Sequence, residues 1–179
     1  MLRKLIFLIC SAIICLMLAK SSWASPSDND DQDSNEFYEE VLRQVLAQDG
    51  WFVIGSYAYK VTRYRRSWLQ TRESCKEMGG YLAYQGIRNN TLKREVGRAI
   101  IGSRYSEGIW IGLNDRLEES EWIWLDGSRA DTIEWDINEP NGFGLENCGE
   151  MWDENKKFMI NDEGCCDLHQ GLCERKIAL

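Results

Sequence analysis

Hydrophobic and polar positions change their pattern along the first part of the chain, and each change predicts a different element. Residues 5–18 form an unbroken apolar run, whereas residues 25–35 (SPSDNDDQDSN) offer almost nothing for a core to bury. Residues 36–48 then carry apolar side chains on one helical stripe that ends before Gly50. The pattern therefore predicts an acidic, disordered linker and a short helix, together residues 25–48, ahead of the main domain.

From residue 49 to residue 177 the pattern is that of a globular domain. Residues 51–61 alternate aromatic and small side chains, which predicts a hairpin of strands. Helices are predicted over residues 68–78, with Ser67 as the N-cap, and over residues 91–101. No long helical period follows, and two short aromatic strands are predicted at residues 109–113 and 121–125. The loop at 136–147 is too polar for a core and too long for a plain connection, so we expect it to be functional.

The start of the chain reads as a secretory signal peptide. Arg3 and Lys4 precede the apolar run, and Ser22-Trp23-Ala24 ends in a small residue, after which cleavage is expected. We expect residues 1–24 to be removed and the protein to be secreted. A membrane anchor is the alternative, but the run is shorter than the roughly 20 residues of a spanning helix, and no later segment is long enough to span.

Composition narrows the range of partners. The chain of 179 residues has a formal net charge of -8, and eight tryptophans give it material for an aromatic core. An acidic protein repels nucleic acid phosphates, so we expect no nucleic acid partner. The same balance suits a protein that keeps carboxylates for a hard cation such as calcium.

Seven cysteines are present, and two of them lie within the predicted signal peptide. In an oxidising compartment the remaining cysteines predict a disulfide framework with one thiol left over. A zinc site made by Cys165, Cys166, His169 and Cys173 is the less favoured alternative, because its three cysteines would have to escape oxidation. The five remaining cysteines are Cys75, Cys148, Cys165, Cys166 and Cys173.

Oxygen ligands concentrate in two stretches near the C-terminal end. The first holds Glu139-Pro140-Asn141 and then Glu146, and the second is Asn161-Asp162. Calcium takes about six to eight oxygen ligands, and carboxylates and amide carbonyls supply them. The plainer interpretation is a solvated acidic surface, because Asn, Asp and Gly are ordinary turn residues.

The order of landmarks from Trp51 to Glu174 resembles the C-type lectin domain family, and the joint order and spacing of the pieces carry the resemblance. The matching pieces, in chain order, are Cys75 with Gly79-Gly80-Tyr81-Leu82-Ala83, Trp110-Ile111-Gly112-Leu113, Trp122-Ile123-Trp124, Asp126-Gly127, Trp135 with Glu139-Pro140-Asn141, Cys148, Asn161-Asp162, Cys165 and Cys173-Glu174.

The resemblance implies an α+β fold in which two helices pack on small antiparallel sheets beside a long calcium-binding loop region. It implies disulfides Cys75–Cys173 and Cys148–Cys165, which leaves Cys166 as a free thiol or a link between chains. A third disulfide of some relatives is absent, because Ala47 and Ala58 stand at its positions.

The resemblance also implies a lectin rather than an enzyme. Its calcium site maps onto Glu139, Asn141, Glu146, Asn161 and Asp162, and two neighbouring sugar hydroxyls would complete the ligands of the ion. In this family a Glu-Pro-Asn motif accompanies mannose, N-acetylglucosamine and fucose, and the bond before the proline is cis. We therefore expect glycans of the mannose type as partners and a cis Glu139–Pro140 bond in the calcium form.

Two departures from the family pattern stand out. Ile160 replaces the tryptophan that usually precedes Asn161-Asp162. A second calcium site of some relatives has two matching carboxylates, Asp115 and Glu119, whereas Gly142 and Asn147 stand where other ligands are expected. We expect no tight binding at that second site.

Other functions remain open from sequence alone. A glycosidase would need an acid and a nucleophilic carboxylate, but the acids here are assigned to a cation. A lectin-like fold that binds protein instead of sugar is the main alternative. The predicted helix or Cys166 would be the means of forming a homo-oligomer, and the sequon Asn89-Asn90-Thr91 makes Asn89 a candidate for N-glycosylation.

Overall fold

The computed structural model describes residues 28–100, 108–153 and 157–177, and the predicted signal peptide lies outside these ranges. Contacts divide the chain into one unit of residues 1–38 and a second unit of residues 39–179. Helix α2 (Asp28–Gln48) begins in the first unit and ends in the second. Within the described ranges no helix combines the length and the apolar character that a membrane crossing requires.

Helix α2 corrects the prediction of a disordered linker over residues 25–35, because it starts at Asp28 rather than at Glu36. The prediction failed because a lack of apolar side chains argues against a core but not against a helix.

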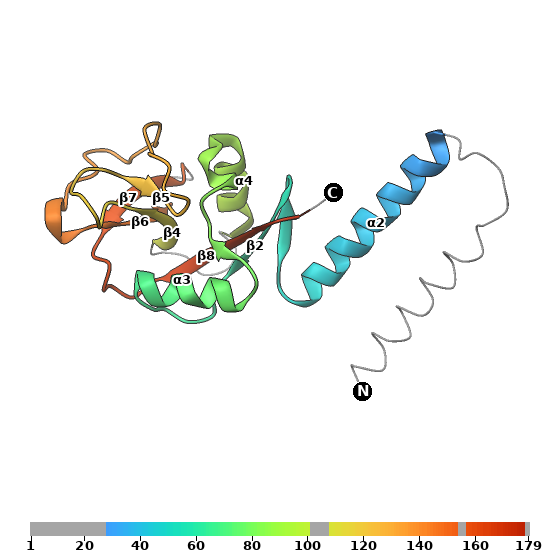
Figure 1. The fold of residues 1–179 in the computed structure, drawn as a ribbon, viewed down its shortest axis with the longest axis horizontal. Helices are drawn as coiled ribbons and strands as arrows, with labels where there is room; N and C mark the ends of the chain where they lie inside the picture. The colour runs from blue at the N-terminus through green and yellow to red at the C-terminus, as the bar shows by residue number, and fades with distance from the viewer. Residues whose placement is uncertain (1–27, 101–107, 154–156, 178–179) are drawn as a thin grey trace. The chain divides into compact units, whose positions relative to one another are not determined.

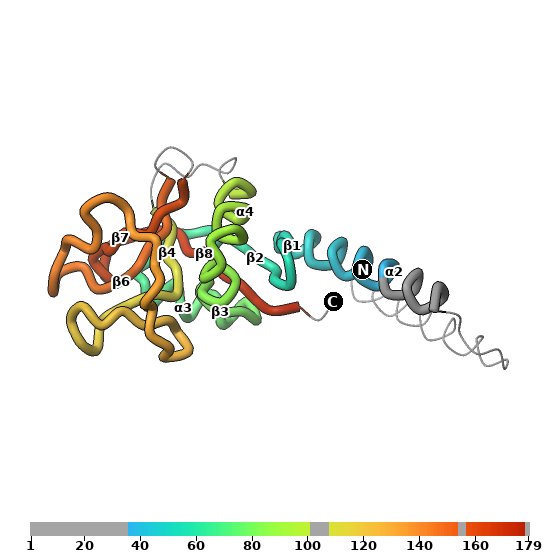
Figure 2. The backbone as a smooth tube through the Cα atoms, turned by 90° about the horizontal axis from the view of Figure 1, so that it is seen from above, coloured from blue at the N-terminus to red at the C-terminus, as the bar shows by residue number. Residues whose placement is uncertain are grey.

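Strands β1 (Phe52–Ile54) and β2 (Tyr57–Val61) form the predicted hairpin. The path of the sheet runs β1-β2-β8-β4-β6-β7, with β3 paired to β8 and β5 paired to β4. Figure 2 shows β4, β6 and β7 close together at one end of the domain, where they pair in this order. The other strands are β3 (Tyr81–Leu82), β4 (Ile109–Asn114), β5 (Ile123–Trp124), β6 (Cys148–Trp152), β7 (Met159–Glu163) and β8 (Gln170–Lys176).

The sheet is mixed, which corrects the expectation of purely antiparallel sheets. Strand β8 pairs antiparallel with β2 and β3 but parallel with β4, at Ile109↔Gln170 and Trp110↔Gly171. Because β8 is the last strand, it enters between the hairpin and β4 after a long return of the chain, and a parallel pair requires such a crossover. Strand β8 therefore joins the two halves of the sheet.

Two helices pack beside the sheet, as predicted. Helix α3 (Trp68–Glu77) begins at Ser67, whose side chain and that of Gln70 form a capping box, and Gly79 follows with a φ of 76°. Helix α4 (Asn90–Ile100) begins where the Asn89 Oδ1 accepts bonds from the backbone of Thr91 (2.9 Å) and Leu92 (3.1 Å). Two short 3-10 turns complete the described helices, η1 (Gly86–Arg88) and η3 (Phe143–Leu145).

The buried tryptophans of the core form their hydrogen bonds within the domain. Trp68 and Trp110 are fully buried, and their indole nitrogens donate to the carbonyls of Ile111 (2.8 Å) and Arg66 (2.9 Å). Ile160, at the position of the usual tryptophan, is also buried in the core. Its substitution is thus accommodated by packing.

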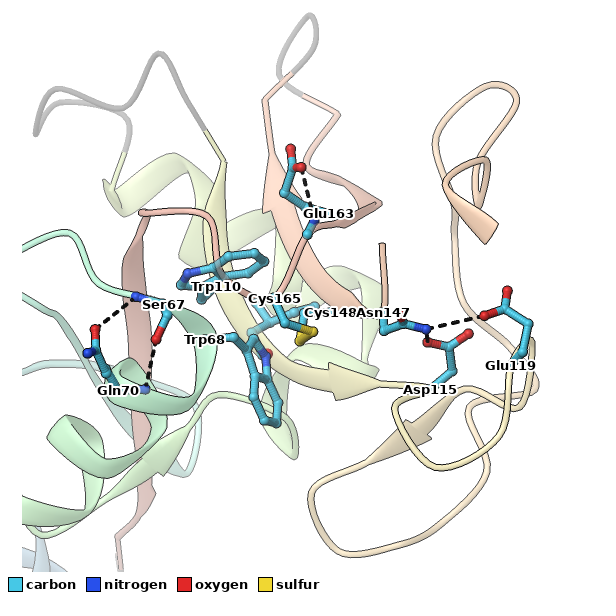
Figure 3. The surroundings of a disulfide bond; sticks show 12 residues. Ser67, Trp68, Gln70, Trp110, Asp115, Glu119, Asn147, Cys148, Glu163 and Cys165 are labelled. Carbon is cyan, nitrogen blue, oxygen red and sulfur yellow. Dashed lines mark hydrogen bonds between the residues drawn. A yellow bond between two sulfur atoms is a disulfide. The ribbon is translucent and has the colours of Figure 1, made fainter. Parts of the chain in front are cut away.

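Both implied disulfides are present. Cys75 of α3 is bonded to Cys173 of β8, and Cys148 of β6 is bonded to Cys165, beside Trp68 and Trp110 in Figure 3. Cys166 is free and exposed. The zinc alternative is therefore wrong, because two of its three thiols are disulfide-bonded.

Candidate functional site

The loop between Trp135 and β6 carries most of the predicted site, and its start is anchored by Asp136. This carboxylate is 8% exposed and accepts hydrogen bonds from the Trp152 indole (2.6 Å) and from the backbone of Ile137 (2.7 Å). The far end of the loop is fixed by Cys148 and its disulfide. In Figure 1 these loops lie at the end of the domain away from the β1–β2 hairpin.

The Glu-Pro-Asn motif lies at the middle of this loop. The Glu139–Pro140 peptide bond is cis, as the resemblance implies. The side-chain nitrogen Nδ2 of Asn141 donates to Glu139 Oε1 at 2.9 Å. The two side chains that flank the proline therefore meet on one side of the loop.

Asp162 fastens the motif to strand β7. Its carboxylate is 1% exposed and accepts a bond at each oxygen, from the backbone of Asn141 (3.0 Å) and from the backbone of Gly142 (2.8 Å). Hydrogen bonds from backbone N–H groups to an ionised carboxylate are stronger than those between neutral groups, so Asp162 holds the loop against β7. Glu139, Asn141 and Asp162 are thus brought together, although Asp162 lies more than 20 residues further along the chain than Glu139.

Glu139 carries an unused oxygen. Its Oε2 is buried and has no hydrogen-bond partner. Burial raises the pKa of Glu139 to about 7, and the carboxylates of Asp162 and Glu146 beside it act in the same direction. A site that crowds carboxylates and leaves one oxygen unpaired suits a bound cation, which would relieve both conditions.

Glu146 follows the turn η3 and faces the same acidic surroundings. Its pKa is raised by burial and then by the carboxylates of Glu163, Asp162 and Asp167. The structure therefore places Glu146 within electrostatic reach of Asp162.

Asn161 has a different neighbour. Adjacent side chains of a strand point to opposite faces, and the Asn161 amide donates to Glu150 Oε1 at 3.1 Å across the β6–β7 pair. Glu150 was missed by the sequence analysis, although a charged residue inside the buried strand Cys148–Trp152 was the available signal. Burial raises the pKa of Glu150 to about 7, and its Oε2 lies 3.4 Å from the Nδ1 of His169.

These residues fit calcium only as a mixed set of ligands. Across the residues that the structure describes, no three Asp, Glu, His or Cys side chains gather closely enough to hold a metal ion. Amide oxygens and main-chain carbonyls would therefore have to complete the carboxylates, which is the kind of oxygen set that calcium accepts. The unpaired oxygen of Glu139 is the observation that supports the fit.

The residues at the second calcium position implied by the family resemblance form hydrogen bonds with one another. The Asn147 amide donates to Asp115 Oδ1 (3.1 Å) and to Glu119 Oε2 (3.2 Å), as the dashed lines in Figure 3 show. The NH2 group of an amide bridges these two carboxylates in place of a cation. This geometry supports the prediction that no tight second site exists, which remains a prediction.

Residues 64–175 match the family described as Lectin C-type domain. The human protein C-type lectin domain family 17, member A is 32% identical over 75% of this chain, which spans 33% of that relative's length. Mouse regenerating islet-derived protein 4 is 28% identical over 79% of this chain and 88% of its own.

Solved structures have the same fold. The carbohydrate-recognition domain of cow CD23, determined in the presence of a GlcNAc2Man3 oligosaccharide, is 27% identical, with a TM-score of 0.62 over 73% of this chain and 96% of that one. A calcium-independent type II antifreeze protein is 21% identical, with a TM-score of 0.61 over 72% of this chain and 93% of that one.

The relatives and fold neighbours are lectins and binding proteins, not enzymes, which confirms the expectation of a non-enzymatic protein. The cysteine pairings, the cis bond and the match over residues 64–175 agree with one another. The chain belongs to the C-type lectin domain family.

Proposed function

We propose that the protein is a secreted, calcium-dependent lectin for sugars of the mannose, N-acetylglucosamine and fucose type. The observation that carries the proposal is the arrangement around Glu139, whose Oε1 accepts from Asn141 while its buried Oε2 has no partner. A cow relative of the same fold was determined with a mannose-containing oligosaccharide.

Five residues would hold the ion: Glu139, Asn141, Glu146, Asn161 and Asp162. When bound, calcium supplies coordination positions for the oxygens of two neighbouring sugar hydroxyls. The carboxylates would accept the hydroxyl protons, and the Asn141 amide would donate to a hydroxyl oxygen, as would the Asn161 amide once it releases Glu150. A sugar with another hydroxyl geometry leaves buried polar groups unpaired, which is the physical basis of selection.

One such site covers little surface, so a single sugar would bind with a Kd of about 1 mM. Useful affinity then requires several domains on one glycan surface. Helix α2 or the exposed Cys166 would link copies of the chain into a homo-oligomer.

The test is retention on mannose-agarose in calcium and release by a chelator. We expect Glu139→Gln to abolish retention and the matched change Glu95→Gln, at an exposed position of α4, to leave it intact. The double change Glu139→Gln with Asn141→Asp should move retention from mannose to galactose resin. Mannose retention that survives the double change would refute the site assignment.

The alternative is a protein-binding module on the lectin fold. The calcium-independent antifreeze protein of the same fold makes a non-sugar role worth testing. Failure on mannose, galactose and fucose resins alike, in calcium and with correctly formed disulfides, would favour this alternative over the lectin.

A further inference from the structure

A basic groove runs along one side of helix α3. Two adjoining hollows of about 270 Å³ and 110 Å³ share Arg72 and Leu125 in their walls. The larger hollow is also lined by Arg116, and the smaller by Lys76. None of the residues that line either hollow is a carboxylate, although the chain contains 29 Asp and Glu residues.

The cations of this groove form a row. Trp68, Arg72 and Lys76 are spaced four residues apart on α3 and therefore share one helix face, over about 12 Å. The guanidinium of Arg116 lies 5.8 Å from the ring centroid of Trp68, at the start of the same row. Three positive groups thus follow one another along the groove.

These cations are mostly not neutralised by partners. Among the described residues, neither Arg72 nor Arg116 forms an ion pair, and Lys76 pairs only with Glu73, at 2.8 Å on the exposed helix surface. An ion pair that is exposed to water is weak, so Lys76 remains available to another anion. Other cations of the domain do have partners, as Arg88 pairs with Asp126 at 2.8 Å.

From this groove we infer a second, calcium-independent binding site for a linear sulfated polysaccharide, held by Arg116, Arg72 and Lys76. Guanidinium groups bind anionic oxygens with two parallel hydrogen bonds, and the lysine adds a point charge. The hollows admit sugar rings, and the row of cations matches a chain that repeats its negative groups.

Other polyanions fit less well. A flat anionic membrane does not enter a hollow. Single-stranded nucleic acid needs successive free aromatic faces, but among the aromatic residues that line the two hollows only Tyr81 is exposed. The site does not depend on the proposed sugar site, because it shares no residue with the calcium ligands.

The test is retention on heparin-agarose in the presence of a chelator, with elution by NaCl. We expect the wild-type protein to be retained, and Arg72→Gln with Lys76→Gln to lower the affinity about tenfold at 0.1 M salt. Arg116→Gln should lower it less. Glu73→Gln should raise it about twofold, because it removes the one carboxylate paired with the row.

The control double variant is Arg98→Gln with Lys157→Gln, which removes the same charge at exposed positions that line neither hollow. Equal losses in both double variants would overturn the site, as would no retention of the wild type. Equal retention on polyglutamate or on an oligonucleotide, with the same variant dependence, would overturn the polysaccharide assignment. All variants keep good helix formers on α3, so circular dichroism would confirm that the helix remains.

Discussion

At the scale of single residues, the buried carboxylates of this domain behave differently according to their partners. Glu174 is 2% exposed and accepts hydrogen bonds from the backbone of Tyr84, Gln85 and Gly86. Glu150 is 3% exposed, but its Oε2 accepts no hydrogen bond and lies 3.4 Å from the Nδ1 of His169. Burial raises the pKa of both carboxylates, but at Glu174 the three backbone bonds counteract this effect, whereas Glu150 lacks such bonds and should oppose folding more at neutral pH.

Glu150→Gln should increase the free energy of unfolding at pH 8 by on the order of 2 kcal/mol. The pKa of Glu150 is about 7 in the folded protein against a model value of 4.5, so the native state favours the protonated form. The contribution of Glu150 to the free energy of unfolding is therefore fully present below pH 4.5 and is lost as the pH rises through 7. Urea unfolding of both proteins in chelator, from pH 4 to 8, would measure the gain. A gain that does not shrink toward acid pH would contradict this account.

Glu174→Ala should lower the free energy of unfolding by about 3 kcal/mol or more, because three backbone N–H groups lose their acceptor. Glu174→Gln keeps one acceptor oxygen and should lose less. Urea unfolding at pH 7 would compare the two variants, and a smaller loss for alanine than for glutamine would show that these bonds do not stabilise the fold.

Sugar binding should weaken as the pH falls, because the pKa of Glu139 is raised to about 7 in the absence of calcium, and bound calcium moves the loss to lower pH. Its pKa is raised by burial and by neighbouring carboxylates, so the group takes up a proton at mild acidity, and a protonated carboxyl is a poor calcium ligand. Retention on mannose-agarose, stepped from pH 8 to pH 5 at each of several constant calcium concentrations, would show it. Loss of retention at the same pH at every calcium concentration would contradict this account, because competition between protons and calcium shifts to lower pH as calcium rises.

At the scale of elements, local sequence signals identified α3, α4, the β1–β2 hairpin, β4 and β5, whereas β3, β6, β7 and β8 were not predicted. Ser67 marked the start of α3, and alternating side chains marked the β1–β2 hairpin. The start of α2 was missed, because its first residues form no apolar stripe in the sequence. The parallel partner of β4 was also missed, since strand pairing over 60 residues leaves no local pattern.

The cap of α4 allows the glycosylation site to be tested without disturbing the helix. Asn89 is exposed and caps α4 with its side-chain oxygen, which leaves the amide nitrogen for a glycan. Asn89→Asp should remove a glycan but keep the cap, whereas Asn89→Ala should remove both and cost about 1 kcal/mol of stability. Glycosidase-sensitive gel mobility and urea unfolding would measure the two effects. A wild-type protein from a secreting cell without such a shift would exclude a glycan at Asn89.

At the scale of the whole domain, family resemblance supplied what local patterns do not. The pairing of Cys75 with Cys173 and the meeting of Asp162 with the Glu-Pro-Asn loop followed from the order of landmarks. The hydrogen bonds from Asn161 to Glu150 and from Asn147 to Asp115 did not follow from it, because side-chain contacts across a sheet depend on the three-dimensional neighbours.

The two disulfides should contribute unequally. The bond Cys75–Cys173 spans 98 residues and Cys148–Cys165 spans 17 residues. By the entropy of loop closure, they stabilise the domain by about 4.7 and about 3 kcal/mol. Paired Cys→Ala changes at each bond, compared by urea unfolding, should show the larger loss for the longer loop. The reverse order would show that native contacts rather than chain entropy decide the contributions.

The central place of β8 has a consequence for the synthesis of the protein. This strand, Gln170–Lys176, pairs with β2, β3 and β4, yet it is the last strand of the domain to be made. While a ribosome is still adding the preceding residues, the hairpin and β4 have no strand between them. The sheet of the nascent chain therefore remains in two parts, and it can be completed only after residue 176 has left the exit tunnel.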